Sequence, residues 1–211
     1  MDNIEESIAQ KTTNHIITES LVRAMSYDDY RAMLNELALL KKSTGLQQTE
    51  ALTNYTLLNS TRMKRLDKTL KFSEELVSKI KKINKKITWL VLTESWCGDA
   101  AQTIPVMNKI ASMNPNIEFK VVLRDENLEL MNRFLTNGTL SIPKLIMVDT
   151  ASNEVLSDWG PRPTIATKMV LDFKKKNGAL TAEFKQDLQG WYTKDKGQNT
   201  ADDLLTSLLL E

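Results

Sequence analysis

The single cysteine of this chain, Cys97, occupies a position that favours thiol chemistry. It lies in the segment Trp96–Ala100, which reads Trp-Cys-Gly-Asp-Ala and follows an apolar run ending at Thr93. The residues after it have helical spacing, which predicts that the thiol lies at the start of a helix. A helix N-terminus carries unpaired backbone N–H groups and partial positive charge, and both stabilise the reactive thiolate. These residues therefore predict a nucleophilic thiol at a strand-to-helix turn.

Cys97 has no second thiol in the chain to resolve a mixed disulfide, and the residue three positions later is Ala100. A single thiolate can still attack a disulfide, a sulfenic acid or a peroxide, provided that an outside thiol such as glutathione regenerates it. Two nearby carboxylates, Glu94 and Asp99, oppose ionisation of the thiol, whereas the helix N-terminus promotes it. The sequence therefore leaves the direction of the Cys97 pKa shift open.

Three charged residues near Cys97 each allow two interpretations. Glu94 is either a group that moves protons at the site or a solvated carboxylate at the end of a strand, and we favour the second. Asp99 either modulates the thiol or is an acid in the first turn of a helix, where carboxylates are favoured, and we again favour the second. Arg124 either lines the site or belongs to the start of the next helix, which we favour. Glu94 and Arg124 are kept as candidate modulators of the thiol.

The composition is that of an ordinary soluble globular protein. Of 211 residues, 41% are hydrophobic and 26% are charged, and the formal net charge is +1. So small a net charge gives no long-range attraction to nucleic acid or anionic lipid, and we expect neither as a partner. The basic stretch Arg62–Lys86 is interpreted as a solvated helix face, because no aromatic residue follows Phe72 within it to stack on bases.

Metal binding and export are also not expected. One cysteine and one histidine cannot supply the four ligands of a structural zinc site, and His15 is expected at the surface. The free thiol fits a reducing compartment, and the acidic N-terminus Met1–Glu6 has no apolar signal region. No run approaches the roughly 18 apolar residues of a membrane span. We therefore expect a cytoplasmic protein with no membrane contact.

Residues 1–85 have the pattern of helices. Ser26 is placed to cap a helix with an acid, Asp29, three residues later, and apolar residues follow at helical spacing up to Leu40. Similar spacing continues between residues 57 and 70, and Ser73 is placed to start a further helix. We expect these helices to bury their apolar faces against the rest of the protein.

From residue 87 the pattern changes to alternating strands and helices, which predicts an α/β fold. The expected order is strand, helix, strand, helix, strand, strand, helix, making a mixed four-stranded sheet flanked by helices. The strands are expected at Ile87–Thr93, Ile117–Leu123, Lys144–Asp149 and Glu154–Trp159, and the helices at Asp99–Ser112, Asn127–Leu135 and Thr164–Lys176. Two short helices are expected near 181–192 and 201–210.

This order, with Trp-Cys-Gly at the first strand-to-helix turn, resembles the thioredoxin superfamily over about residues 86–176. Pro105 lies eight residues after Cys97, where thioredoxins carry a helix-kinking proline, while Pro143 and Gly160 fall where the family has its cis-proline and a glycine after the last strand. The chain is similar to bacterial proteins called thioredoxin family proteins, which combine this single-cysteine motif with a helical N-terminal extension. The resemblance implies three parts: residues 1–85 packed on the core, the thioredoxin-like domain 86–176, and helices in 177–211.

Several positions depart from the family pattern. The resemblance places a buried aspartate where this chain has Val91, a lysine where it has Val121, and the resolving cysteine where it has Ala100. Single-cysteine glutaredoxins bind glutathione with a Gly-Gly-x-Asp turn, and some of them also bind an iron–sulfur cluster. The segment Trp159–Arg162 does not reproduce that turn. We therefore expect no cofactor.

Two functions remain open at this point. In the first, Cys97 carries out monothiol exchange or redox sensing through mixed disulfides with proteins or with low-molecular-weight thiols such as glutathione. In the second, the site is redox-inactive, and a groove formed by Trp96, Ile142 and Pro143 binds protein or peptide partners, because the backbone before the cis-proline can pair with an extended chain. In either case Gly98 and Ala100 shape the turn, and the N-terminal helices are candidates for covering it.

Overall fold

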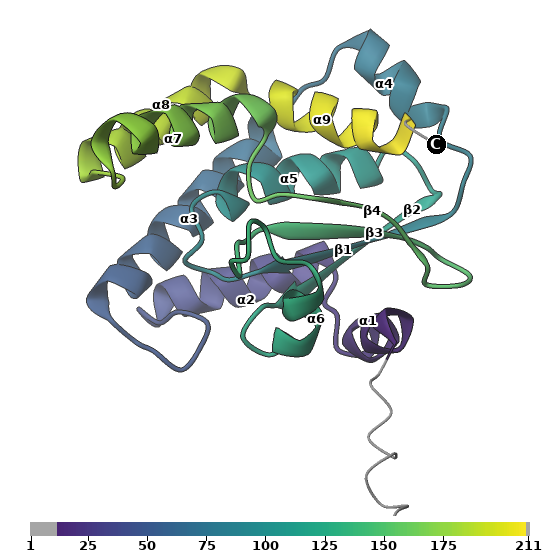
Figure 1. Ribbon diagram of the computed structural model, residues 1–211, viewed down its shortest axis with the longest axis horizontal. Coiled ribbons are helices and arrows are strands. Elements are labelled where there is room, and N and C mark those ends of the chain that lie inside the picture. Colours follow the sequence, from purple (N-terminus) through teal and green to yellow (C-terminus); the bar gives the residue numbers. More distant parts are fainter. Residues whose placement is uncertain (1–11, 210–211) are drawn as a thin grey trace, which may run out of the picture.

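The computed structural model describes residues 12–209 and places a four-stranded sheet between layers of helices (Figure 1). The strands are β1 (Ile87–Thr93), β2 (Ile117–Leu123), β3 (Lys144–Asp149) and β4 (Val155–Trp159). Their order in the sheet is β2-β1-β3-β4, with β1 parallel to β2 and antiparallel to β3, and β3 antiparallel to β4. The expected mixed α/β fold is confirmed, with β4 beginning one residue later than predicted.

Helices cover both faces of the sheet: α5 and α9 lie on one side, and α1, α2 and α6 on the other (Figure 1). Among residues 12–209, no helix combines the length and apolar character needed to span a membrane. The helices are α1 (Thr13–Val22), α2 (Tyr27–Leu39), α3 (Glu50–Thr69), α4 (Glu74–Lys81), α5 (Ala100–Ala111), α6 (Leu128–Arg133), α7 (Thr164–Asn177), α8 (Ala182–Asp195) and α9 (Gln198–Leu209).

Two predicted helix caps are present, and one helix is shorter than expected. Ser26 and Asp29 form a reciprocal capping box at the start of α2, and the Ser73 side chain caps α4. Helix α6 is shorter than the predicted 127–135, and Asn127 makes no side-chain cap for it. The acidic N-terminal segment 1–6 and residue 210, the predicted end of the last helix, lie outside the described residues.

The centre of the core is β1, all of whose residues are buried. A strand covered on both faces consists almost entirely of apolar and β-branched residues, which matches its sequence. Val91 lies opposite Val121 in the parallel register, and both side chains are fully buried. The two positions where the family resemblance implies an acid and a lysine are thus neighbours in the apolar core.

The N-terminal helices are tied to the sheet and to one another. Met25, just before α2, pairs with Val121 at the edge of β2 through backbone hydrogen bonds of 2.8 and 2.9 Å. Tyr27 and Arg31 of α2 both donate to the carboxylate of Asp67 on α3. Helix α3 packs on both α2 and α5, so it connects the two helical layers.

Helices α7 and α8 form a hairpin with its own apolar cluster. Phe173 and Phe184 stack with their ring centroids 4.1 Å apart, and Val170 and Leu188 are buried in the same cluster. This cluster is distinct from the main core around β1. The hairpin is therefore held together internally, and α8 is free to present polar side chains toward the turn before α5.

Gly160, directly after β4, is required by close packing of the backbone. Its φ is +126°, a conformation that residues with a Cβ rarely adopt, and an added Cβ would overlap the carbonyl oxygen of Pro143. The Ile142–Pro143 peptide bond is cis. Gly160 thus packs directly against the segment that faces Cys97.

We expect Gly160→Ala to lower the free energy of unfolding by about 3 kcal/mol or more, because it combines backbone strain with steric overlap. Gly138→Ala is the matched control, since its φ is +72° but an added Cβ meets no atom within 4 Å. The control should lose only about 1–2 kcal/mol from the left-handed conformation. Urea unfolding of both variants checks this, and equal losses would contradict the packing argument.

Candidate functional site

The thiol of Cys97 is enclosed at the turn between β1 and α5. Its Sγ lies 3.3 Å from the carbonyl oxygen of Ile142, and the N–H of Ala100 points at Sγ from 3.5 Å. Cys97 is only 8% exposed, and Ile142, beside the cis-proline, is equally buried. The structure therefore brings together the cysteine turn and the Ile142–Pro143 segment, which are far apart in sequence.

Burial raises the pKa of the Cys97 thiol to about 12, and the charge of Asp99 adds to this shift. The backbone N–H groups of Ala100 and Asp99 and the guanidinium of Arg162 act in the opposite direction but do not compensate. The direction of the shift that the sequence left open is thus upward. At neutral pH the enclosed thiol is protonated, and the thiol is a poor nucleophile compared with the thiolate.

Asp99 is the polar centre of this site. Its Oδ2 lies 2.6 Å from Nη2 of Arg162, and its Oδ1 accepts a hydrogen bond of 3.0 Å from the Tyr192 hydroxyl of α8. Asp99 is 9% exposed and stands at the N-cap position of α5, as the helix-start interpretation expects, but its side chain makes no capping hydrogen bond to that helix. Burial raises the pKa of Asp99, while Arg162 and Tyr192 oppose that rise.

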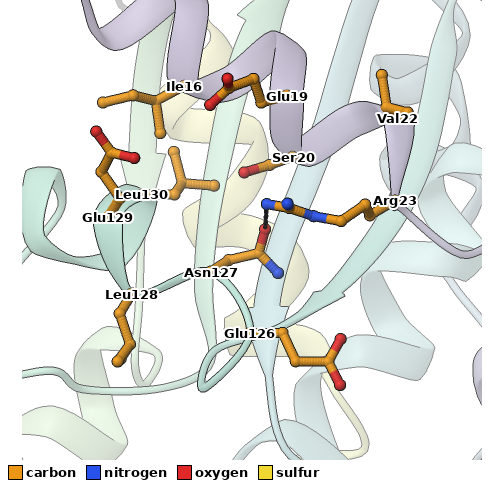
Figure 2. Close-up of a pocket in the computed structure, with 10 residues that line it drawn as sticks. All are labelled: Ile16, Glu19, Ser20, Val22, Arg23, Glu126, Asn127, Leu128, Glu129 and Leu130. Carbon is orange, nitrogen blue, oxygen red and sulfur yellow. Dashed lines mark hydrogen bonds between the residues drawn. The ribbon is translucent and has the colours of Figure 1, made fainter. Parts of the chain in front are cut away.

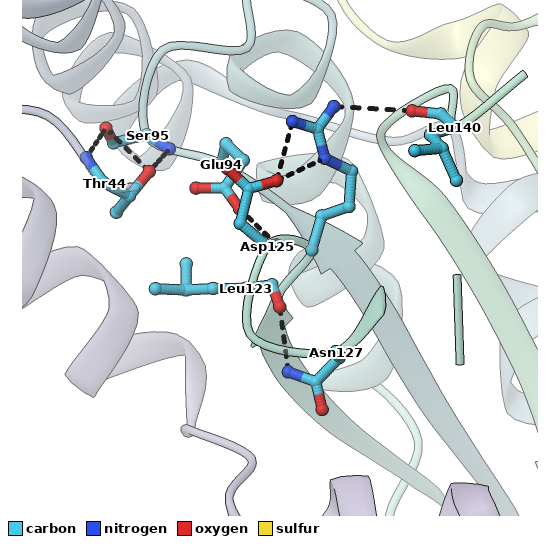
Figure 3. A network of polar contacts seen from close by, with 8 residues as sticks. Thr44, Glu94, Ser95, Leu123, Asp125, Asn127 and Leu140 are labelled. Atoms are coloured by element: carbon cyan, nitrogen blue, oxygen red, sulfur yellow. Dashed lines mark hydrogen bonds and ion pairs between the residues drawn. The ribbon is translucent and has the colours of Figure 1, made fainter. Parts of the chain in front are cut away.

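Glu94 is fully buried, so its interpretation as a solvated carboxylate is wrong. Its Oε1 accepts the backbone N–H of Asp125 at 2.9 Å, whereas its Oε2 has no hydrogen-bond partner among the described residues (Figure 3). Burial raises the pKa of Glu94, while the hydrogen bond from the N–H of Asp125 opposes the rise. The carboxyl group is therefore poised to take up a proton.

Ser95 fixes the turn to Thr44 in the loop before α3 (Figure 3) and also to α3 itself. Ser95 and Thr44 exchange two hydrogen bonds of 2.9 Å, each from a backbone N–H to the other's hydroxyl. Thr56 of α3 bonds the Ser95 hydroxyl at 2.8 Å, and Asn59 donates to the Ser95 carbonyl at 2.9 Å. These contacts, all between residues at least 36 positions apart, hold the backbone that leads into Cys97.

Arg124 lies at the site itself. Its guanidinium carbon is 5.1 Å from the centroid of the partly exposed Trp96 ring, which is within the range of a cation–π contact. The same guanidinium pairs with Asp125 at 2.8 Å. Arg124 therefore orients the indole of the motif, which the favoured helix-start interpretation did not foresee.

A pocket of about 650 Å³ opens beside Cys97. The turn contributes Trp96, Cys97, Gly98 and Asp99, and Ile142 comes from the cis-proline segment. Helix α3 contributes one wall, which includes Tyr55, Leu58 and Arg62, and α8 contributes the other, which includes Lys185 and Gln189. The pocket thus lies between the cysteine turn and helices from both ends of the chain.

Helix α8 is held against the turn by polar contacts that the sequence gave no reason to expect. Gln102 of α5 donates to Gln189 at 2.9 Å, and Arg65 of α3 donates to Thr193 at 3.2 Å. Together with the Tyr192–Asp99 bond, these contacts join α3, α5 and α8 around Cys97. Arg162, which pairs with Asp99, was likewise not singled out from the sequence.

A second cavity of about 640 Å³ lies between α1 and α6, away from Cys97 (Figure 2). Arg23 crosses it and donates to the side chain of Asn127 at 3.1 Å. None of the residues that line it belongs to the cysteine turn. Within residues 12–209, no cluster of three or more His, Cys, Asp or Glu side chains is arranged to hold a metal ion.

A mixed sheet of this order, with a Trp-Cys-Gly turn after its central strand facing a cis-proline, defines a thioredoxin-like protein. A family model described as Thioredoxin matches residues 45–181, well over half of the chain. The chain therefore belongs to the thioredoxin family. The matched range includes α3 and α4 as well as the sheet.

Two solved structures share the fold, whereas no curated protein matches the chain. A protein of unknown function from Pseudomonas aeruginosa has a TM-score of 0.55 and 18% identity, over 87% of this chain and 97% of that one. An HIV epitope-scaffold has a TM-score of 0.52 and 17% identity, over 87% and 98% of the two chains. At such identities the similarity shows the fold alone.

Asp99→Asn is expected to speed alkylation of Cys97 by iodoacetamide at pH 8. The substitution removes a negative charge that raises the thiol pKa and leaves the Arg162 guanidinium to stabilise the thiolate. Asp187→Asn, an exposed acid on α8 outside the pocket, is the control and should leave the rate unchanged. An unchanged or slower rate in Asp99→Asn would contradict this electrostatic assignment.

Glu94→Gln is expected to stabilise the protein at pH 8 by about 1–3 kcal/mol, because an ionised, partly unpartnered carboxylate is costly to bury. The raised pKa means that wild-type Glu94 takes up a proton as pH falls, so the advantage of glutamine should shrink toward pH 4. Urea unfolding at both pH values measures this. Glu126→Gln, at an exposed position, is the control, and a gain in Glu94→Gln that grows on acidification would refute the assignment.

Proposed function

We propose that this protein is a non-catalytic binding member of the thioredoxin family, which takes a partner noncovalently into the pocket beside Cys97. One observation carries the proposal: the pocket is of ligand-binding size, while the thiol in its wall is buried and has a raised pKa. Cys97 then acts as a packing and hydrogen-bonding residue that supports the cis-proline segment.

The groups around Cys97 support binding over exchange. Ala100 occupies the position of the resolving cysteine, and its N–H contacts Sγ. Val91 and Val121 fill the interior positions where the family resemblance implies an acid that moves protons and a lysine. Noncovalent binding in the pocket requires neither a resolving cysteine nor groups that move protons.

Protein or peptide partners and a cytoplasmic location remain predictions from the sequence.

Monothiol exchange is the second candidate, and the position of Sγ in the pocket wall favours it. In that reaction the Cys97 thiolate attacks the glutathione sulfur of a disulfide between glutathione and a protein thiol, forms a mixed disulfide with glutathione and releases the protein thiol as its thiolate. A second glutathione thiolate then attacks the glutathione sulfur of the mixed disulfide, which yields oxidised glutathione and regenerates Cys97. The net outcome is exchange without loss or gain of electrons.

A neutral apolar dye, N-phenyl-1-naphthylamine, tests the binding function by fluorescence titration. Wild type and Cys97→Ser should bind it with the same dissociation constant, because a serine hydroxyl can still donate to the Ile142 carbonyl. Ala182→Trp should abolish binding, since Ala182 is an exposed residue of the pocket wall that a large ring would fill.

Glu183→Trp is the matched control, because Glu183 is the next residue on α8, is exposed, and lies outside the pocket wall. It should retain the dye affinity of wild type. Dye binding that persists unchanged in Ala182→Trp would overturn the binding function. A stoichiometric glutathione adduct on Cys97 after incubation with oxidised glutathione at pH 7.5 would instead establish the second candidate.

A further inference from the structure

The pocket beside Cys97 concentrates positive charge. Its walls contain four basic residues, Arg62, Arg124, Arg162 and Lys185, and one acidic residue, Asp99, whose carboxylate is already paired with Arg162. The chain as a whole has a formal net charge of only +1. The excess of cations is thus a local property of this pocket.

Two of these cations are available to a ligand. Arg162 is engaged by Asp99, and Arg124 by Asp125. Among the described residues, neither Arg62 nor Lys185 forms an ion pair, and Arg62 donates only to the neutral amide oxygen of Asn59 at 3.0 Å. Burial lowers the pKa of Arg62, so a bound anion would stabilise its charged form.

Donors from α3 and α8 converge above Gly98. A Cβ placed on this glycine would lie 3.5 Å from Nη1 of Arg62 and 3.5 Å from Nε2 of Gln189. The Gln189 oxygen is occupied by its bond from Gln102, which leaves the amide N–H₂ group facing this position. A guanidinium and an amide donor directed to one place are suited to a planar or tetrahedral anion.

The same pocket has an apolar part that is open to water. Tyr55 and Leu58 of α3 are 43% and 44% exposed, and Leu140, before the cis-proline, is 39% exposed. All three line the pocket, as does the partly exposed ring of Trp96. Covering these side chains with an apolar ligand is favourable, because it removes their surface from water.

We propose that the pocket binds a small anionic ligand with an apolar body, in which a carboxylate, sulfonate or phosphate group contacts Arg62, Gln189 and Lys185. The apolar body of the ligand packs on Tyr55, Leu58 and Leu140. This assignment of ligand class rests on the binding function proposed above. The assignment specifies the charge and polarity of the ligand, which the binding function alone leaves undefined.

The test compares two dyes that share an anilinonaphthalene body and differ in charge. 1-Anilinonaphthalene-8-sulfonate carries an anionic group, and N-phenyl-1-naphthylamine is neutral. Wild type should bind the anionic dye more tightly. Arg62→Gln combined with Lys185→Gln should weaken the anionic dye by about tenfold or more, the loss expected for charge-assisted hydrogen bonds. The neutral dye should change by less than about twofold.

Lys64→Gln combined with Lys194→Gln is the matched control. It removes the same number of charges from exposed positions on α3 and α8 that lie outside the pocket wall, and both dyes should bind to it as to wild type. Equal affinity of wild type for the two dyes, or equal weakening of the anionic dye in both double variants, would overturn the ligand class and leave the binding function standing. If neither dye shows pocket-dependent binding, both the ligand class and the binding function are overturned.

Discussion

The buried carboxylate of Asp99 is the interaction on which the site depends. Through Arg162 and Tyr192 it joins the turn after β1, the loop after β4 and helix α8. Burying a carboxylate is unfavourable unless cations and hydrogen-bond donors compensate it, and both are supplied here by distant parts of the chain. The contact encloses Cys97, places α8 as a pocket wall and adds negative charge beside the thiol, so one ionic cluster determines both the shape and the chemistry of the site.

The thioredoxin fold is retained here with different groups inside it. Val91 and Val121 pack in the core at the positions where the family resemblance implies an acid and a lysine, and Ala100 lies where it implies the resolving cysteine. The cis-proline segment still faces the cysteine, with the Ile142 carbonyl 3.3 Å from Sγ. Helices α3 and α8 complete a pocket beside this segment, with Arg62 on one wall and Lys185 on the other.

Local sequence patterns were sufficient for the sheet and for most helices, because strand burial and helix capping are encoded by adjacent residues. The apolar run of β1 and the cap at Ser26 are examples. The environments of Glu94 and Asp99 could not be predicted in this way. Glu94 is enclosed by the loop containing Thr44, and Asp99 by a tyrosine 93 residues away, so their burial is a tertiary property. The same reason explains why α8 was not foreseen as part of the site.

We infer that Cys97 is a protonated part of the pocket wall at neutral pH. The most direct test is the pH dependence of its alkylation by iodoacetamide in the folded, full-length protein, with the fold monitored by circular dichroism. With a thiol pKa near 12, the rate should still be rising at the highest pH at which the protein remains folded. A rate that reaches its plateau near pH 7 to 8 would show a thiolate at neutral pH and contradict the claim.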